Sequence, residues 1–146
     1  MGVSAGALVA AGLRCPQLVA RVFVEPFFST AKLEPLAAVV RDHQSEISEP
    51  FWPWLWTVLG ISAEAIEDRR YEHLLVGDLP IYAVVGDVPL SKPITGQLPS
   101  LTDEADRARL AAVGARLRIA RGGHDLPFSD RDAITETVLA ATQGRA

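Results

Sequence analysis

Three runs of β-branched and other apolar residues stand out along the chain, and each is long enough for a strand. They cover residues 18–24, 79–85 and 115–120. In the third run arginines alternate with Leu117 and Ile119. Elsewhere apolar residues recur every three or four positions, which predicts helices. The predicted helices cover residues 5–14, 30–41, 62–75, 102–113 and a last stretch that follows Ser129.

Polar residues mark the starts of three of these helices. N-cap residues are expected at Thr30, Thr102 and Ser129, because a side-chain oxygen there accepts a free amide N–H of the first turn. Pro35 lies within the first turns of the second helix, so that helix alternatively begins at Glu34. Strands that alternate with helices predict an α/β fold with a parallel sheet in one domain.

Composition narrows the class of protein. The chain has 146 residues, of which 49% are hydrophobic and 22% charged, as in a folded domain. A net charge of −4 and the lack of a Lys/Arg run argue against a nucleic-acid partner. No apolar run reaches the roughly 18 residues of a membrane span, and no positive charge precedes Arg14 as a signal peptide requires. We therefore expect a cytoplasmic protein without a membrane partner. The single cysteine, Cys15, excludes a multi-cysteine metal site.

The N-terminus carries a motif with chemical meaning. Gly2-Val3-Ser4-Ala5-Gly6 has the pattern G-x-S-x-G, in which a serine sits on a tight turn between a strand and a helix. The strained turn requires small residues two positions away on each side. The predicted helix over residues 5–14 follows, and its positive end favours a developing oxyanion. A preceding strand is expected for this motif, but none is predicted because the chain begins at Met1.

Three sequence motifs, taken in their order along the chain, resemble the C-terminal half of the α/β-hydrolase superfamily. The resemblance extends from Gly2 to about Ala141. The first is the G-x-S-x-G turn, and the second is the strand Ile-Tyr-Ala-Val-Val that ends in Gly-Asp. The third is Gly-Gly-His-Asp-Leu-Pro before the last helix, which is similar to the histidine loop of that superfamily. The chain order serine, carboxylate, histidine is the order of that family.

The resemblance implies the roles of individual residues. Ser4 would be the nucleophile, His124 the general base and acid, and the amide of Ala5 an oxyanion donor. The acid has two candidates. Glu25 directly follows the first predicted strand and is preferred, and Asp87 after the second strand is the alternative. Without the resemblance, the interpretation is that Glu25 is a solvated residue at the end of a strand and that Asp87 is a turn residue that binds loop amides.

The three tryptophans, Trp52, Trp54 and Trp56, fall within five positions and have two interpretations. They either pack a local core or line an apolar pocket for an acyl or aromatic group. The family inserts its lid at about this place, so residues 44–78 are expected to form a cap-like segment within a single hydrolase portion spanning 1–146.

The function that this resemblance implies is serine hydrolysis of an ester, thioester or amide through an acyl-enzyme. A small-molecule acyl substrate is expected, with no cofactor and no metal. The strands that precede the nucleophile in that family have no counterpart here, so a truncated chain that is inactive alone is also expected. Its partner would be a polypeptide that carries the other half, or a second copy. The alternative is a non-catalytic remnant or interaction subunit.

Overall fold

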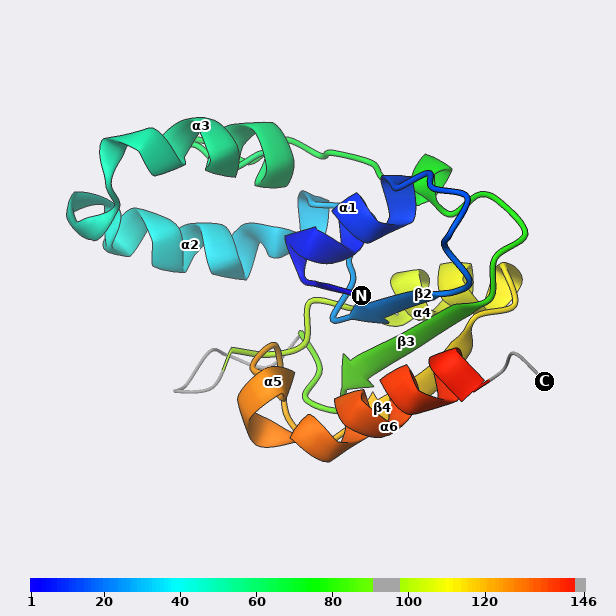
Figure 1. Cartoon of the computed structure of the whole chain (residues 1–146). Coiled ribbons are helices and arrows are strands. Elements are labelled where there is room, and N and C mark those ends of the chain that lie inside the picture. The colour runs from blue at the N-terminus through cyan, green and yellow to red at the C-terminus, as the bar shows by residue number, and fades with distance from the viewer. Residues whose placement is uncertain (91–97, 144–146) are drawn as a thin grey trace. The chain divides into compact units, whose positions relative to one another are not determined.

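Four strands form one parallel sheet in the order β1-β2-β3-β4 (Figure 1). Their bounds are Gly2–Val3, Arg21–Val24, Ile81–Gly86 and Arg116–Ala120. This computed structural model describes residues 1–90 and 98–143. The predicted α/β class with a parallel sheet is confirmed. The expectation that no strand precedes Ser4 is wrong, because Gly2 and Val3 pair with Phe23 and Val24.

The two central strands are apolar because both of their faces are covered. Every residue of β2 and β3 is buried, which explains why the apolar runs there are continuous rather than alternating. The outer strand β4 differs, since Leu117 and Ile119 remain 38% and 50% exposed. Within the described residues, β1 and β4 are the edge strands of the sheet.

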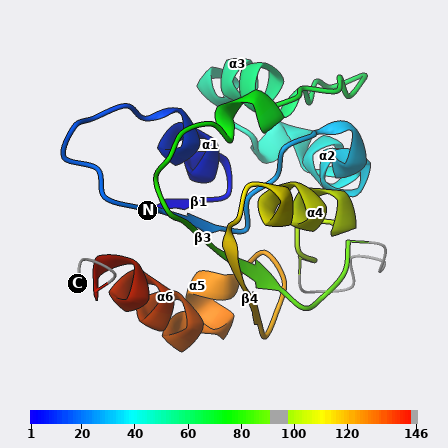
Figure 2. The same ribbon diagram turned by 90° about the vertical axis from the view of Figure 1, so that its right-hand side faces the viewer.

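Helices cover both faces of the sheet. Helices α1 and α4 lie on one face and α5 and α6 on the other (Figure 2). Their bounds are Ala5–Gly12, Glu104–Ala112, Leu126–Ser129 and Arg131–Gln143. On the α5–α6 face, buried side chains of both central strands meet those of the last two helices. This cluster is formed by Val24, Val84, Ala120, Leu126 and Ala133. Each helix in the described ranges is too short or too polar to span a membrane.

Two predicted helix caps are wrong by one residue. Asp103, not Thr102, caps α4, because its carboxylate accepts the N–H of Asp106 at 2.9 Å. The Thr102 hydroxyl instead donates to the carbonyl of Pro26 at 2.6 Å. A carboxylate outcompetes a neighbouring hydroxyl at a helix N-terminus because its charge also meets the helix dipole.

At the last helix, the carboxylate of Asp130 rather than the Ser129 hydroxyl accepts the N–H of Ala133, at 3.2 Å. Asp130 also accepts the N–H of Arg121 at 3.0 Å. The amides of Arg121 and Ala133 hold the pKa of this carboxyl below its usual value. One side chain therefore joins the two ends of the loop between β4 and α6, in which His124 lies.

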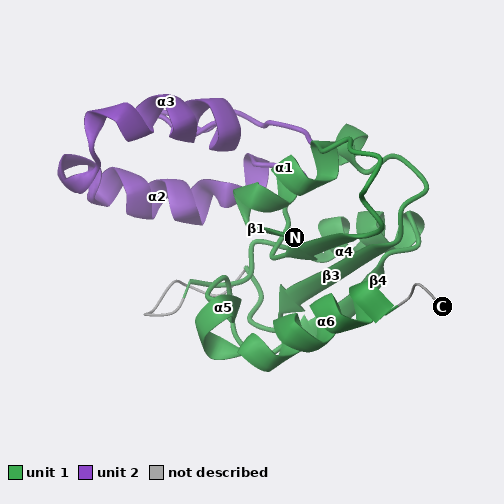
Figure 3. Cartoon of the chain, in the orientation of Figure 1, with its two compact units in different colours: residues 1–27, 72–146 green, residues 28–71 purple. Residues whose placement is uncertain are grey.

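The chain divides into two compact units (Figure 3). Unit 1 comprises residues 1–27 and 72–146 and contains the sheet, and unit 2 comprises residues 28–71. In unit 2, the 3-10 turn Ala31–Leu33 leads into α2, which spans Glu34–Asp42. Two further 3-10 turns, Gln44–Glu46 and Glu49–Phe51, connect α2 to α3, which spans Trp52–Trp54, and the π-helical turn Leu55–Leu59 follows. That residues 44–78 act as a lid stays a prediction.

The helix predicted over residues 62–75 is wrong. Ile61 pairs with Ile66 in an antiparallel bridge, and a 3-10 turn over Glu72–Leu74 is the one helical segment in this described stretch. Ser62 turns the chain instead, since its hydroxyl oxygen accepts the N–H of Ala65 at 3.0 Å. Side-chain competition of this kind removes donors that a helix needs.

Thr30 lies at the N-cap position of the 3-10 turn Ala31–Leu33, but its side chain makes no capping hydrogen bond, and α2 begins at Glu34, the alternative start. The Thr30 hydroxyl donates to the carbonyl of Glu67 and accepts the N–H of Arg69, both at 2.7 Å. These contacts cross unit 2, so Thr30 closes the ends of this unit rather than capping a helix.

Candidate active site

Ser4 occupies a strained turn between β1 and α1. Its backbone angles are φ 53° and ψ −126°, in a region that residues other than glycine rarely adopt. Such a conformation costs about 1–3 kcal/mol and is typically found at functional sites. The N–H of Ser4 donates to the carbonyl of Val24 at 2.8 Å, which holds the turn against β2. The Ser4 hydroxyl makes no capping hydrogen bond to α1.

The glycines on either side of Ser4 have different environments. A Cβ atom at Gly2 would overlap the carbonyl of Gly6, so the turn excludes a side chain at position 2. A Cβ atom at Gly6 would meet no atom within 4 Å among the described residues. The sequence argument that both flanks must be small is therefore correct for Gly2 and wrong for Gly6.

Ala5 is the first residue of α1. The first amides of a helix have no intrahelical acceptor, so the Ala5 N–H has none within α1 and can donate to an external oxygen. The positive end of the helix dipole adds to this preference for negative charge, although the helix has only eight residues.

Glu25 is fully buried directly after β2 and has a positive φ of 52°. Its carboxylate is surrounded by donors. Oε1 accepts the N–H of Gly86 at 2.6 Å and the hydroxyl of Ser100 at 2.8 Å. Oε2 accepts the N–H of Leu101 at 2.8 Å and lies 3.5 Å from Nδ1 of His124. Both oxygens of this buried carboxylate therefore have hydrogen-bond partners.

His124 lies in the loop after β4, with its side chain 19% exposed. Its backbone N–H donates to the carbonyl of Leu98 at 2.9 Å. Gly123 allows this approach, since a Cβ atom there would overlap the Leu98 carbonyl. Because Nδ1 faces Glu25, Nε2 is the nitrogen that remains for another group. The 3.5 Å separation is at the outer limit of a hydrogen bond.

Ser4, Glu25 and His124 all follow strands of one parallel sheet, at the edge where the carboxyl ends of strands meet. The structure brings Glu25 and His124 into contact. It forms no hydrogen bond between the Ser4 hydroxyl and His124 in the described residues. Free enzymes often form this hydrogen bond only in the substrate complex.

Asp87 is exposed, and its carboxylate binds a backbone amide. Its carboxylate accepts the N–H of Gly122 at 2.9 Å, and its own N–H donates to the carbonyl of Ala120. These contacts hold the start of the histidine loop. The carboxylate that contacts the ring of His124 is that of Glu25.

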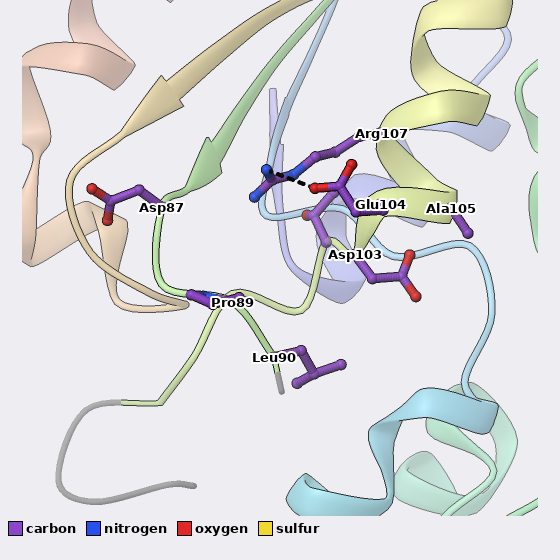
Figure 4. A pocket seen from close by; sticks show the side chains of 8 residues that line it. Asp87, Pro89, Leu90, Asp103, Glu104, Ala105 and Arg107 are labelled. Carbon is purple, nitrogen blue, oxygen red and sulfur yellow. Dashed lines mark hydrogen bonds and ion pairs between the residues drawn. The ribbon is translucent and has the colours of Figure 1, made fainter. Parts of the chain in front are cut away.

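A cavity of about 320 Å³ lies between the end of β3 and the start of α4 (Figure 4). Its wall includes an ion pair between Arg107 and Glu104 at 3.4 Å, while the Asp87 side chain points away from this pair (Figure 4). The lining residues are Asp87, Pro89, Leu90, Thr102, Asp103, Glu104, Ala105 and Arg107. Ser4, Glu25 and His124 are not among these residues.

The tryptophans of unit 2 separate into two environments. Trp52 and Trp56 line an apolar cavity of about 370 Å³, together with Pro53, Ile61, Ser62 and Ala63. Trp54 instead stacks on Phe51, with ring centroids 4.8 Å apart. The guanidinium of Arg69 lies 5.1 Å from the ring centre of Trp56. Phe51 and Trp54 are both exposed, so their stack is not a buried core. That the cavity beside Trp52 and Trp56 takes an acyl or aromatic group stays a prediction.

Sequence reasoning missed the hydrogen-bond donors that surround the Glu25 carboxylate. Gly86, Ser100 and Leu101 contact Glu25 across 61 to 76 positions of sequence. Residues 88–101 look like an ordinary loop, and no local signal could reveal these contacts. Among the described residues, no group of three or more His, Cys, Asp or Glu side chains is arranged to hold a metal ion.

Comparisons with known proteins yield one distant structural likeness. No protein-family model and no curated protein sequence matches the chain. An esterase from Pyrococcus furiosus is similar in structure, with a TM-score of 0.48 and 13% sequence identity. The similarity covers 97% of this chain and 52% of the esterase, so the chain spans about half the length of that protein.

Proposed function

We propose that the chain is a serine hydrolase of the α/β-hydrolase type, with Ser4, His124 and Glu25 as its triad. One observation carries the proposal: a fully buried, donor-rich carboxylate faces Nδ1 of the histidine that follows the last strand. The strained serine between β1 and α1 supports it. Nucleophile, acid and base then occur in the chain order of that family.

The proposed reaction begins when Ser4 Oγ attacks the carbonyl carbon of an ester, thioester or amide. The hydroxyl proton passes to Nε2 of His124, and the carbonyl electron pair moves to oxygen, where the Ala5 N–H stabilises it. The tetrahedral adduct then expels the alcohol, thiol or amine, which takes the proton from His124. Water attacks the acyl-enzyme in the same way and regenerates Ser4. Glu25 holds the ring and stabilises the imidazolium.

A fluorophosphonate probe tests this proposal, because it forms a stable bond to an activated serine. For an active chain, labelling is expected at Ser4, to be abolished by Ser4→Ala and to fall strongly in His124→Gln. A folded 146-residue chain that does not label would support the inactive, truncated alternative. Ser48→Ala, at an exposed serine of unit 2, is the control. Labelling that survives Ser4→Ala, or mass-spectrometric mapping of the adduct to another residue, would overturn the assignment.

For the substrate, we propose an acyl group with an apolar chain or ring, and Trp52 and Trp56 of unit 2 stay the candidate side chains for binding it. The apolar wall of the unit 2 cavity supports this choice, and its volume suits a small hydrocarbon group. Trp54 packs on Phe51 and is assigned no role in binding. Trp56→Ala is expected to raise KM for medium-chain esters more than for acetate esters. Trp54→Ala is the control, and equal effects on both chain lengths would contradict the assignment.

A second candidate function is strand pairing at the open edge of β1, with a second copy as the partner. The exposed apolar side chains Val9 and Leu13 of the neighbouring helical segment favour it, at 71% and 48% exposure. Sedimentation of the Ser4→Ala chain tests this role separately from catalysis. A dimer that Val9→Glu dissociates supports it, and a monomer at 100 micromolar, on the order of high assay concentrations, contradicts it.

A further inference from the structure

The Glu25 carboxylate accepts hydrogen bonds from residues 100 and 101, a segment that contains none of the proposed triad residues. Ser100 is fully buried, and its hydroxyl donates to Oε1 of Glu25 at 2.8 Å. The next amide, of Leu101, donates to Oε2 at 2.8 Å. Two adjacent residues thus contact both oxygens of the acid, which fixes the rotation of the carboxylate plane.

The direction of the Ser100 hydroxyl is itself fixed. Its oxygen accepts the N–H of Thr102 at 3.2 Å. The hydroxyl has one proton, and Glu25 at 2.8 Å is a nearer and more negative acceptor than the Thr102 carbonyl at 3.4 Å. The Thr102 hydroxyl in turn donates to the carbonyl of Pro26, the residue after the acid. The segment is therefore bonded to the acid and to its neighbour in the chain.

The same segment also reaches the base. The carbonyl of Leu98 accepts the backbone N–H of His124 at 2.9 Å, and Gly123 leaves room for this contact. Residues 98–102 thus contact the acid through Ser100 and Leu101, and the histidine through Leu98. No other segment in the described part of the chain contacts both groups in this way.

We infer that Ser100 is a positioning residue, which orients the Glu25 carboxylate so that Oε2 faces Nδ1 of His124. This inference rests on the proposed function, and it assigns Ser100 no contact with substrate. Loss of the hydroxyl leaves Oε1 with one donor and lets the carboxylate rotate about the remaining amide contacts. The imidazole then loses its orientation, although the sheet and helices are unchanged.

The experiment compares Ser100→Ala with Ser29→Ala. Ser29 donates to Asp68 at 2.8 Å, so the control removes a hydrogen bond of the same type and length from unit 2. Ser100→Ala is expected to slow fluorophosphonate labelling of Ser4 by roughly ten-fold, and Ser100→Thr, which keeps the hydroxyl, to restore most of the rate. Ser29→Ala is expected to leave the rate unchanged.

A second readout does not depend on catalysis. In a Ser4→Ala background, the NMR resonance of the Nδ1 proton of His124 reports its contact with Glu25. Ser100→Ala is expected to shift or broaden this resonance, and Ser29→Ala to leave it in place. Should Ser100→Ala fail to fold, Thr102→Val loosens the same segment at Pro26 and is read in the same way.

The outcomes separate the two ideas. A chain that does not label, but whose His124 resonance responds to Ser100→Ala, removes the proposed reaction and keeps the positioning role. A chain that labels normally, with an unchanged resonance and rate in folded Ser100→Ala, overturns the positioning role and keeps the reaction. Equal losses in Ser29→Ala and Ser100→Ala also overturn it, because the effect would then be one of stability.

Discussion

A buried ionisable side chain lies at each end of strand β2, and the two side chains differ in their hydrogen-bond partners. Arg21 begins the strand and is 4% exposed, whereas Glu25 directly follows it and is fully buried. Glu25 receives three hydrogen bonds and faces His124. The Arg21 guanidinium donates to two backbone carbonyls, and its Nε has no partner within the described residues.

The difference lies in how completely each buried charged group is hydrogen-bonded. Burial, and then the charge of Arg14, lower the pKa of Arg21 from its usual value, so the protein disfavours this cation. Both oxygens of the Glu25 carboxylate instead accept hydrogen bonds. A fully buried carboxylate beside a histidine, at the carboxyl edge of the sheet, is a candidate for function.

The largest effect is expected from Glu25→Gln. The amide of Gln places an NH₂ group against the N–H donors of Gly86 or Leu101, which leaves at least one buried donor unsatisfied. We expect a loss of about 3 kcal/mol or more in the free energy of unfolding, measured by urea denaturation. With Glu25 as the acid of the proposed triad, labelling of Ser4 should fall by about a thousand-fold or more.

A Glu25→Gln chain that is as stable as the parent would contradict the contrast drawn between Glu25 and Arg21 at the two ends of β2. It would mean that the donors around the acid find water or new partners without cost. Far-ultraviolet circular dichroism of both chains shows whether any loss of labelling occurs in the folded state.

The next effect is expected from Gly123→Ala, which tests the carboxyl edge through its backbone. The new methyl group overlaps the Leu98 carbonyl, so the histidine loop must move away from the segment that holds the acid. We expect a loss of about 2–3 kcal/mol in thermal or urea unfolding. Gly6→Ala is the matched control, because its methyl group meets open space and Ala favours a helix by up to about 1 kcal/mol. Equal effects of the two changes would show that the close approach at Leu98 is not needed.

The sequence predicts the elements of this edge better than it predicts the contacts between them. The continuous apolar runs of β2 and β3 and the G-x-S-x-G turn are local patterns, so the sheet class and the place of Ser4 could be predicted. The preference for Glu25 over Asp87 came from a resemblance, and the contact of Glu25 with His124 supports it without testing the role. The donors Ser100 and Leu101 lie 75 and 76 positions from Glu25, and their contacts depend on the whole fold.

The errors have a common physical cause. Residues 62–75 have helical spacing, but Ser62 binds nearby amides and Ile61 pairs with Ile66. Thr30 and Thr102 look like helix caps, yet each hydroxyl bonds a distant backbone carbonyl. Threonine and serine have one hydroxyl that serves either a local or a distant partner, and spacing alone does not distinguish these uses.

At the other end of β2, Arg21→Met is expected to change stability by no more than about 1 kcal/mol, with stabilisation the expected sign. Methionine fills a similar volume without the cost of a buried cation. The two carbonyls released, of Leu13 and Val76, belong to exposed residues and can bind water. Calorimetric unfolding measures this change. A loss of 3 kcal/mol, on the order of that expected for a broken ion pair, would show that Arg21 has an anionic partner and that the two ends are alike.

The smallest effect is expected from Asp87→Asn, at the same edge of the sheet as Glu25. Asp87 is exposed, and the side-chain oxygen of Asn can still accept the N–H of Gly122. Stability should change by less than about 0.5 kcal/mol, and the labelling rate of Ser4 should stay the same within about two-fold. A position at the carboxyl edge is then insufficient for the role of the acid, which also requires burial and contact with His124. If Asp87→Asn slows labelling as much as Glu25→Gln does, the acid is Asp87, and the donors around Glu25 serve the fold alone.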